Sequence, residues 1–383
     1  MAIYFLIYFV VLIYAIREDY KLSPKLRIVI LVILALFLCT GYMTGSDWRN
    51  YEYITIINQN AYEIRGPEFG FYWLVNFPTS NGIDFWILWI ILKIFCFYSL
   101  IKSLKYFIGI KDGWALLYFY AYFSLFYFID NPMRNLIAAS IFVFSYKYIE
   151  QRNIKHYCLI CLLAAMMHAS TLLIFPIYFI YKKISQLPTS LFITIPLIFY
   201  LFLLAFYITG MNAYINIFMS FIFGDSFRGQ NYLNDDVNYI SLGLVFTYVI
   251  YVYVIINRNI IETANKHGKF LISISFVFIC SLMIGFFIPI LYRLIMFTFI
   301  PFIASINIIM YNKRADIIKI MTKVTLVVFL GIVMKKNITH DFRYIPYTSY
   351  LEYIGKSKPS YQYRSSYNLD NSPYRKSILD NDN

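Results

Sequence analysis

Three side chains in this sequence have the chemistry of a general base. Asp47 and Glu68 bracket a polar segment that follows the second apolar run, and His168 interrupts a later apolar segment just before Ser170. Ionisable groups are costly in such surroundings and usually mark function. The structural alternative is that the carboxylates pair with nearby arginines and that the histidine hydrogen-bonds Ser170 or a carbonyl group. The sequence does not rank the three as base.

Four arginines are candidates for binding an anion. Arg134 and Arg293 each follow a tight proline-containing turn, which predicts that both lie at helix N-termini, where backbone N–H groups favour negative charge. Arg49 and Arg228 lie in the two longest polar segments between apolar runs. A guanidinium holds phosphate oxygens in a bidentate manner, so several arginines together suit a lipid diphosphate. In the structural alternative, each arginine anchors a helix end.

Aromatic residues make up 21% of the chain, with 38 Tyr and 37 Phe. Because tyrosine rings stack well on sugars, Tyr51 and Tyr347 are predicted to contact an acceptor sugar. A codon bias toward aromatic and other residues is the alternative explanation. Cys158 and Cys161 have the spacing of a metal half-site, but no second pair or nearby histidine completes it. We therefore predict no metal and no cofactor.

The composition indicates a helical membrane protein. The chain is 60% apolar and 14% charged, whereas soluble domains carry about 25% charged residues. Repeated long apolar runs exclude a soluble fold, and the absence of alternating strands disfavours a transmembrane barrel. The net charge of +13 resides mostly in short loops, as membrane orientation requires, so it does not indicate nucleic-acid binding.

Twelve apolar runs are predicted to be membrane spans. They cover residues 2–16, 26–44, 83–101, 114–129, 135–149, 157–169, 171–181, 190–209, 239–257, 269–287, 291–310 and 316–334. The pair within 157–181 is shorter than the ~20 residues a span needs, which predicts a broken or re-entrant hairpin. Lysine-rich alternate loops are predicted to be cytoplasmic, which places the candidate residues outside. Residues 1–334 then form a transmembrane domain, and 335–383 a polar outer tail whose last ~25 residues are predicted to be disordered.

The ordered motifs resemble those of the EpsG-like group of Wzy-type polysaccharide polymerases. They are Gly45-x-Asp47-x3-Tyr51, Glu68-x-Gly70-Phe71, Arg134-Asn135-x-Ile137-Ala138, His168-x-Ser170, Arg293 and Ile345-Pro346-Tyr347. The resemblance implies a polytopic glycosyltransferase of the lipid-sugar-using, GT-C-like architecture. Such enzymes join undecaprenyl-diphosphate-linked oligosaccharide units at the outer face of the bacterial inner membrane, for O-antigen, capsule or exopolysaccharide. The implied partners are this lipid-linked substrate, membrane lipid and a chain-length regulator protein. The polar tail beyond Tyr347 departs from the family pattern.

The reaction needs positive charge for a leaving diphosphate and a base for an acceptor hydroxyl. The candidates for the diphosphate are Arg134, Arg293, Arg49 and Arg228, and those for the base are Asp47, Glu68 and His168. A flippase for the same lipid-linked sugar would need no base, but the internal repeat common in transporters is missing from the sequence. A membrane acyltransferase would need a histidine near a cytosolic acyl donor, whereas His168 is predicted outside. The sequence does not specify the sugars, the linkage or the oligomeric state.

Overall fold

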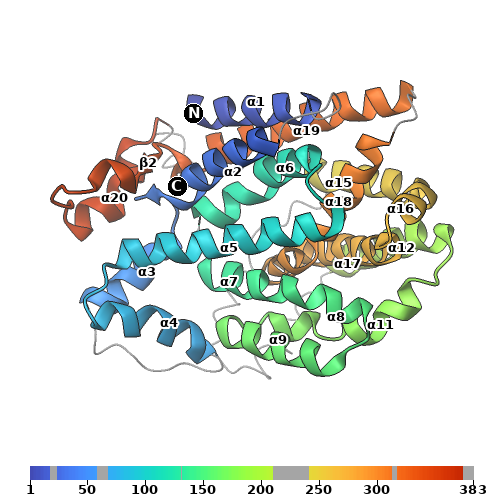
Figure 1. Ribbon diagram of the computed structural model, residues 1–383, viewed down its shortest axis with the longest axis horizontal. Helices are drawn as coiled ribbons and strands as arrows, with labels where there is room; N and C mark the ends of the chain where they lie inside the picture. The colour runs from blue at the N-terminus through green and yellow to red at the C-terminus, as the bar shows by residue number, and fades with distance from the viewer. Residues whose placement is uncertain (18–23, 58–67, 131, 210–240, 313–316, 374–383) are drawn as a thin grey trace.

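The computed structural model describes residues 1–17, 24–57, 68–130, 132–209, 241–312 and 317–373. Helices dominate the fold, and the chain forms a bundle in which segments from both halves of the sequence pack together (Figure 1). Each of the twelve predicted apolar runs contains helix. The apolar runs therefore identified these helical segments, whereas the helices Asp47–Glu52, Phe69–Ser80 and Tyr361–Asn371 lie outside the twelve runs.

The helices and strands follow one another in this order. The first part of the chain contains α1 (Ala2–Arg17), α2 (Pro24–Cys39), β1 (Gly41–Tyr42), α3 (Asp47–Glu52), η2 (Tyr53–Ile57), α4 (Phe69–Ser80) and α5 (Phe85–Ile108). The middle part contains α6 (Gly113–Tyr118), the π-helical η5 (Phe119–Asp130), α7 (Met133–Phe142), η6 (Val143–Ser145), α8 (Tyr146–Glu150), α9 (Ile154–Met167), α10 (Thr171–Ile174), α11 (Ile177–Ile184) and α12 (Thr189–Ile208). The last part contains α15 (Leu242–Ile256), α16 (Arg258–Ala264), α17 (Gly268–Phe287), η7 (Pro289–Phe297), α18 (Phe299–Tyr311), α19 (Ile317–His340), η8 (Phe342–Tyr344), β2 (Thr348–Ser349), η9 (Tyr350–Tyr353) and α20 (Tyr361–Asn371).

Four helices among the described residues are long and apolar enough to cross a membrane, namely α5, α12, α17 and α19. The number rises to six if each of two bent pairs forms one span; α15 and α16 are bent by 59°, and η7 and α18 by 53°. The apolar helices α1 and α9 are shorter. The fold is that of a helical membrane protein, while the twelve spans, their orientation and the GT-C-like architecture stay predictions.

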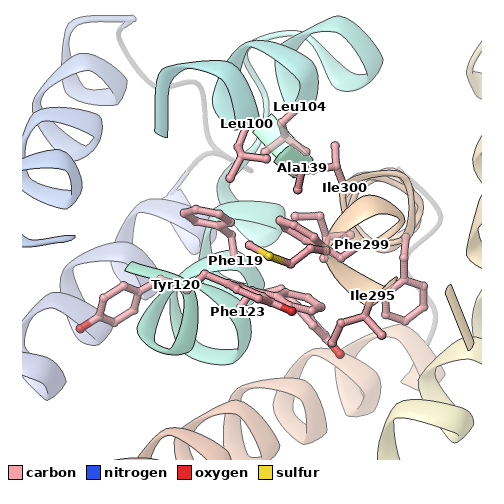
Figure 2. Close-up of a cluster of buried hydrophobic side chains, with 14 of the residues drawn as sticks. Leu100, Leu104, Phe119, Tyr120, Phe123, Ala139, Ile295, Phe299 and Ile300 are labelled. Atoms are coloured by element: carbon pink, nitrogen blue, oxygen red, sulfur yellow. The ribbon is translucent and has the colours of Figure 1, made fainter. Parts of the chain in front are cut away.

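Buried aromatic side chains fix η5 at the centre of the bundle. Figure 2 shows Phe119 and Phe123 of η5 packed toward Phe299 of α18, and the rings of Phe123 and Phe299 stack with centroids 4.3 Å apart. Between helices in lipid, association depends on close van der Waals packing rather than on the hydrophobic effect. The last residue of η5, Asp130, accepts a hydrogen bond of 2.9 Å from Ser46 Oγ just before α3.

The C-terminal segment folds back onto the end of the bundle that carries α3 (Figure 1). Strand β2 pairs antiparallel with β1, with Gly41 opposite Ser349. Helix α20 then packs near α3, where Tyr361 Oη donates to the Arg49 carbonyl oxygen over 3.1 Å. Part of the tail that the sequence predicted to be disordered, residues 361–371, is therefore helical. Residues 374–383 lie outside the described part of the chain.

Candidate active site

Glu68 brings three of the predicted site residues together. The residue precedes α4, and its Oε1 accepts hydrogen bonds from His168 Nδ1 and, over 3.1 Å, from the Ala169 backbone N–H. Its other oxygen, Oε2, lies 2.5 Å from Nη1 of Arg134. His168 is buried and Glu68 nearly so, with 12% of its side chain exposed. A carboxylate thus holds an imidazole and a guanidinium in fixed positions.

The close approach of α4 to α9 depends on Gly70. A Cβ atom at this position would lie 2.9 Å from Met166 Cβ and 3.1 Å from the Met166 carbonyl oxygen, whereas carbon atoms in contact prefer about 3.5–4.0 Å. Glycine is the residue that lets the first turn of α4 pack against the last turn of α9. Because Gly70 follows Glu68 by two residues and Met166 precedes His168 by two, this contact sets the distance between carboxylate and imidazole.

Arg293 closes the cluster from the other side of the imidazole. Its Nη1 lies 3.3 Å from His168 Nε2. Arg134 is the second residue of α7 and therefore lies at a helix N-terminus, as predicted. Arg293 lies in the middle of the 3-10 helix η7, so the same prediction is wrong for Arg293. Segment η7 packs back on α17 because Gly285 leaves room for it; a Cβ there would lie 2.6 Å from Tyr292 Cα. We call Glu68, Arg134, His168 and Arg293 the Glu68 cluster.

Asn135 connects the elements that carry the cluster. Its Nδ2 donates to the Arg293 carbonyl oxygen over 3.3 Å, and its Oδ1 accepts a hydrogen bond of 3.1 Å from Ser170 Oγ. Asn135 is buried in α7 beside Arg134. One side chain therefore ties α7 both to η7 and to the turn that contains His168. This contact gives a physical reason for the sequence pairs Arg134-Asn135 and His168-x-Ser170.

The hydrogen bonds fix the tautomer of His168. An arginine side chain only donates hydrogen bonds, so Nε2 of His168 accepts from Arg293, and the imidazole proton lies on Nδ1, where it is donated to Glu68. A carboxylate on one ring nitrogen holds the tautomer and orientation that leave the other nitrogen basic. The neutral ring therefore presents a lone pair at Nε2, on the side of Arg293.

Electrostatics favour an ionised Glu68 and a neutral His168. Burial by itself would raise the pKa of the Glu68 carboxyl, but the hydrogen bond from His168 and the charge of Arg134 outweigh it and lower the pKa to about 2. The Arg293 guanidinium can donate to His168 Nε2 only if that nitrogen carries no proton, so the hydrogen bond favours a neutral imidazole. At neutral pH, Nε2 therefore carries a lone pair, which in this structure accepts the hydrogen bond from Arg293.

Asp47 lies at the edge of the cluster, at the start of α3. Burial raises the pKa of its carboxyl from 3.8 to about 6, and the charge of Asp130 contributes to the rise, while Arg134 and Arg293 oppose it. Asp130 is itself paired with Arg343, whose Nη1 lies 2.9 Å from Asp130 Oδ2. The sequence reasoning missed Asp130 and Arg343. Asp130 carried the same signal as Asp47, a carboxylate at the end of an apolar run.

The remaining predicted site residues lie in different places. Tyr51 is buried beside the cluster, and the Arg134 guanidinium carbon lies 5.7 Å from the centroid of its ring. The guanidinium of Arg49 lies over the ring of Trp48, on the α20 side of α3. Tyr347 donates a hydrogen bond of 2.6 Å to the Phe37 carbonyl oxygen and stacks on the Phe37 ring. Among its contacts that the structure describes, none is with the Glu68 cluster, and Arg228 lies outside the described residues.

A second ion pair, also missed from the sequence, fixes α3 from behind. Glu52, the last residue of α3, accepts hydrogen bonds from Arg364 Nη1 over 2.8 Å and from Trp86 Nε1 over 3.0 Å. Glu52 is 3% exposed and Arg364 7% exposed, so the pair is shielded from water. Because α3 also carries Asp47 and Tyr51, helix α20 contributes to the position of both. In the part of the chain that the structure describes, no group of three or more His, Cys, Asp or Glu side chains has the arrangement of a metal site.

The fold and the site together define a helical membrane protein with a largely buried Glu–His–Arg cluster. The family model of the EpsG family matches residues 25–349, which is most of the 383-residue chain, and the chain belongs to this family. The family is associated with polysaccharide polymerase-type glycosyltransferase activity. No curated protein and no solved structure matches the chain. Helix α20 lies beyond the matched residues.

Proposed function

We propose that this protein is a polysaccharide polymerase that joins undecaprenyl-diphosphate-linked oligosaccharide units at the outer face of a bacterial inner membrane. The observation that carries the proposal is the position of Glu68 between His168 and Arg134, with Arg293 on the second nitrogen of the imidazole. Glycosyl transfer from a lipid diphosphate needs a base and a concentration of positive charge near the same atoms. The Glu68 cluster contains both.

In the proposed reaction, His168 acts as the general base. Its Nε2 takes the proton of an acceptor hydroxyl at the non-reducing end of a lipid-linked unit. The hydroxyl oxygen forms a bond to the anomeric carbon of the growing chain. The bond between that carbon and the diphosphate oxygen breaks, and the electron pair leaves with the diphosphate. Glu68 stabilises the imidazolium that forms, as a carboxylate does for histidine in other general-base sites.

Arg134 and Arg293 bind the leaving diphosphate in this mechanism. Arg134 is already held by Glu68, so it is preorganised for a phosphate oxygen. Arg293 donates to His168 Nε2 over 3.3 Å, a long contact that a phosphate oxygen replaces easily. Movement of Arg293 onto the diphosphate uncovers Nε2 for the acceptor hydroxyl. Binding of the donor would thereby activate the base.

Asp47 and Tyr51 complete the proposed site. With a pKa raised by burial to about 6, Asp47 is mostly ionised at neutral pH and accepts hydrogen bonds from sugar hydroxyls. The buried ring of Tyr51 keeps Arg134 in place through a cation–π contact. Asp47 is also the second candidate base, and variants separate the two: loss of polymer in Asp47→Asn with full polymer in His168→Gln would assign the base to Asp47.

Deletion of the gene, followed by gel analysis of the surface polysaccharide, tests the function. Loss of the polymer ladder with one repeat unit retained is the expected result. Loss of even the single unit would indicate a flippase or an earlier transferase, and an unchanged ladder would refute the proposal. Complementation with His168→Gln should fail. His156→Gln, an exposed histidine near the start of the same helix α9, should restore the ladder and serves as the matched control.

A further inference from the structure

An apolar groove runs between α2 and α5, outside the Glu68 cluster. It has a volume of about 750 Å³, and the two helices pack against each other beside it. Helix α2 lines it with residues 28, 31, 32 and 35, and α5 with residues 94, 97, 98, 101, 102 and 105. This spacing places the lining on one face of each helix. The groove therefore follows the helix axes.

The groove has the length of one membrane leaflet. Ile94 and Lys105 are eleven positions apart in α5, which corresponds to roughly 17 Å at 1.5 Å per residue. One leaflet contributes about 15 Å, half of the ~30 Å hydrocarbon core. Between these ends the lining is apolar, with Leu31, Ala35 and Phe97 among its residues. Its length and lining suit an acyl chain.

The cationic residues of the groove gather at one end. Arg27 lies in the first turn of α2, and Lys102 and Lys105 lie in the last two turns of α5. Arg27 is paired with Asp112, with Nε 3.0 Å from Oδ2. The Nζ atom of Lys102 lies 5.4 Å from the centroid of the Tyr98 ring. Within the described ranges of the chain, neither lysine has a carboxylate partner.

Among the described residues, the carboxylates packed near this end have partners other than the two lysines. Asp112 is buried and held by Arg27 and by the Tyr14 hydroxyl. Glu150 accepts a hydrogen bond of 3.2 Å from Tyr106 Oη and lies 2.9 Å from His267 Nδ1. In the part of the chain that the structure describes, no carboxylate therefore offsets the positive charge of these two exposed lysines at the mouth of the groove.

We propose that this groove binds an anionic phospholipid. Its acyl chain lies between α2 and α5, and its headgroup phosphate lies at Lys102 and Lys105. The lysines are at the end of α5 remote from α3 and α4 (Figure 1), so the bound lipid belongs to the leaflet opposite the Glu68 cluster. The groove does not suit a polyprenyl diphosphate bound at that cluster, because the charged head of this lipid would lie at the end of the groove that carries no cations.

The test is native mass spectrometry of the full-length protein titrated with phosphatidylglycerol or with phosphatidylcholine of the same acyl chains. Lys102→Gln with Lys105→Gln should weaken retention of phosphatidylglycerol about 25-fold, since each lysine near a membrane surface contributes roughly fivefold. Lys182→Gln with Lys183→Gln is the matched control, because these exposed lysines at the end of α11 do not line the groove. Ala35→Trp fills the groove while leaving both lysines in place.

The proposal predicts that the wild-type protein retains phosphatidylglycerol in preference to phosphatidylcholine. The Lys102→Gln/Lys105→Gln double variant and Ala35→Trp should lose this preference, and the Lys182→Gln/Lys183→Gln double variant should keep it. Equal retention of the two lipids would overturn it. So would an equal loss in the control pair, which would show a general effect of surface charge, or full retention by Ala35→Trp, which would show that no chain enters the groove. The melting temperature of each variant, measured in the same detergent, separates these outcomes from misfolding.

Discussion

Replacing Gly70 by alanine adds one methyl group at the contact that brings Glu68 beside His168. The new Cβ would lie 2.9 Å from Met166 Cβ, about 0.6–1 Å closer than carbon atoms prefer. Helices α4 and α9 must separate by a comparable distance to accommodate it. All charged groups of the site stay in the protein, so the substitution tests geometry alone.

The expected effect on activity is larger than the effect on stability. Overpacking costs about 1–3 kcal/mol, and the gain from replacing a helical glycine by alanine returns about 0.5–1 kcal/mol. The net destabilisation is therefore at most about 2.5 kcal/mol. A displacement of about 1 Å in a catalytic constellation costs roughly 10²-fold in rate. Gly70→Ala should fold and yet lose about two orders of magnitude of polymerisation.

The assay is chain length and yield of polymer in a deletion strain that expresses each variant at matched protein levels. Gly331→Ala is the control, because a Cβ at Gly331 in α19 would meet only the Tyr8 hydroxyl, at an ordinary 3.9 Å. A Gly70→Ala strain with a normal ladder would refute the argument that the contact between α4 and α9 sets the geometry of the site.

Three further predictions concern other parts of the structure. Gly285→Ala, whose Cβ would lie 2.6 Å from Tyr292 Cα, should displace η7 and Arg293 and weaken substrate binding; a KM equal to wild type would contradict this. Burial raises the pKa of the Asp47 carboxyl from 3.8 to about 6, so its contribution to stability is full below pH 3.8 and is lost as the pH rises through 6. Asp47→Asn should therefore stabilise the protein by up to about 3 kcal/mol at pH 7.5 and not at pH 4. Thermal unfolding at the two pH values measures the difference. Arg364→Met should lower the free energy of unfolding by about 3–5 kcal/mol, because it leaves the buried carboxylate of Glu52 unpaired. The double variant Arg364→Met with Glu52→Gln should recover most of that loss.

The residues of the Glu68 cluster were predictable as candidates because each is out of place in an apolar sequence. Glu68, Arg134, His168 and Arg293 interrupt or flank segments that otherwise suit hydrocarbon. Their mutual contacts were not predictable. Glu68 and His168 are separated by 100 positions, and the distance between them depends on how closely α4 packs against α9.

The ion pairs around α3 were missed for the same reason. Glu52 and Arg364 are 312 positions apart, and nothing in the spacing of either residue indicates its partner. Apolar runs predicted where helices form, because backbone groups in an apolar environment must be hydrogen-bonded within the segment. The number of spans does not follow from these runs alone, since packing bends some helix pairs by more than 50°.

The most direct test of the central claim is polymerisation by the purified protein in lipid nanodiscs, supplied only with an undecaprenyl-diphosphate-linked repeat unit. The wild-type protein should form polymer and release one undecaprenyl diphosphate for each bond made. His168→Gln should slow both about 10²–10⁴-fold, the usual contribution of a general base, and His156→Gln should slow neither. Polymer formed at the wild-type rate by His168→Gln, or no polymer from the wild-type protein, would contradict the assignment of glycosyl transfer to the Glu68 cluster.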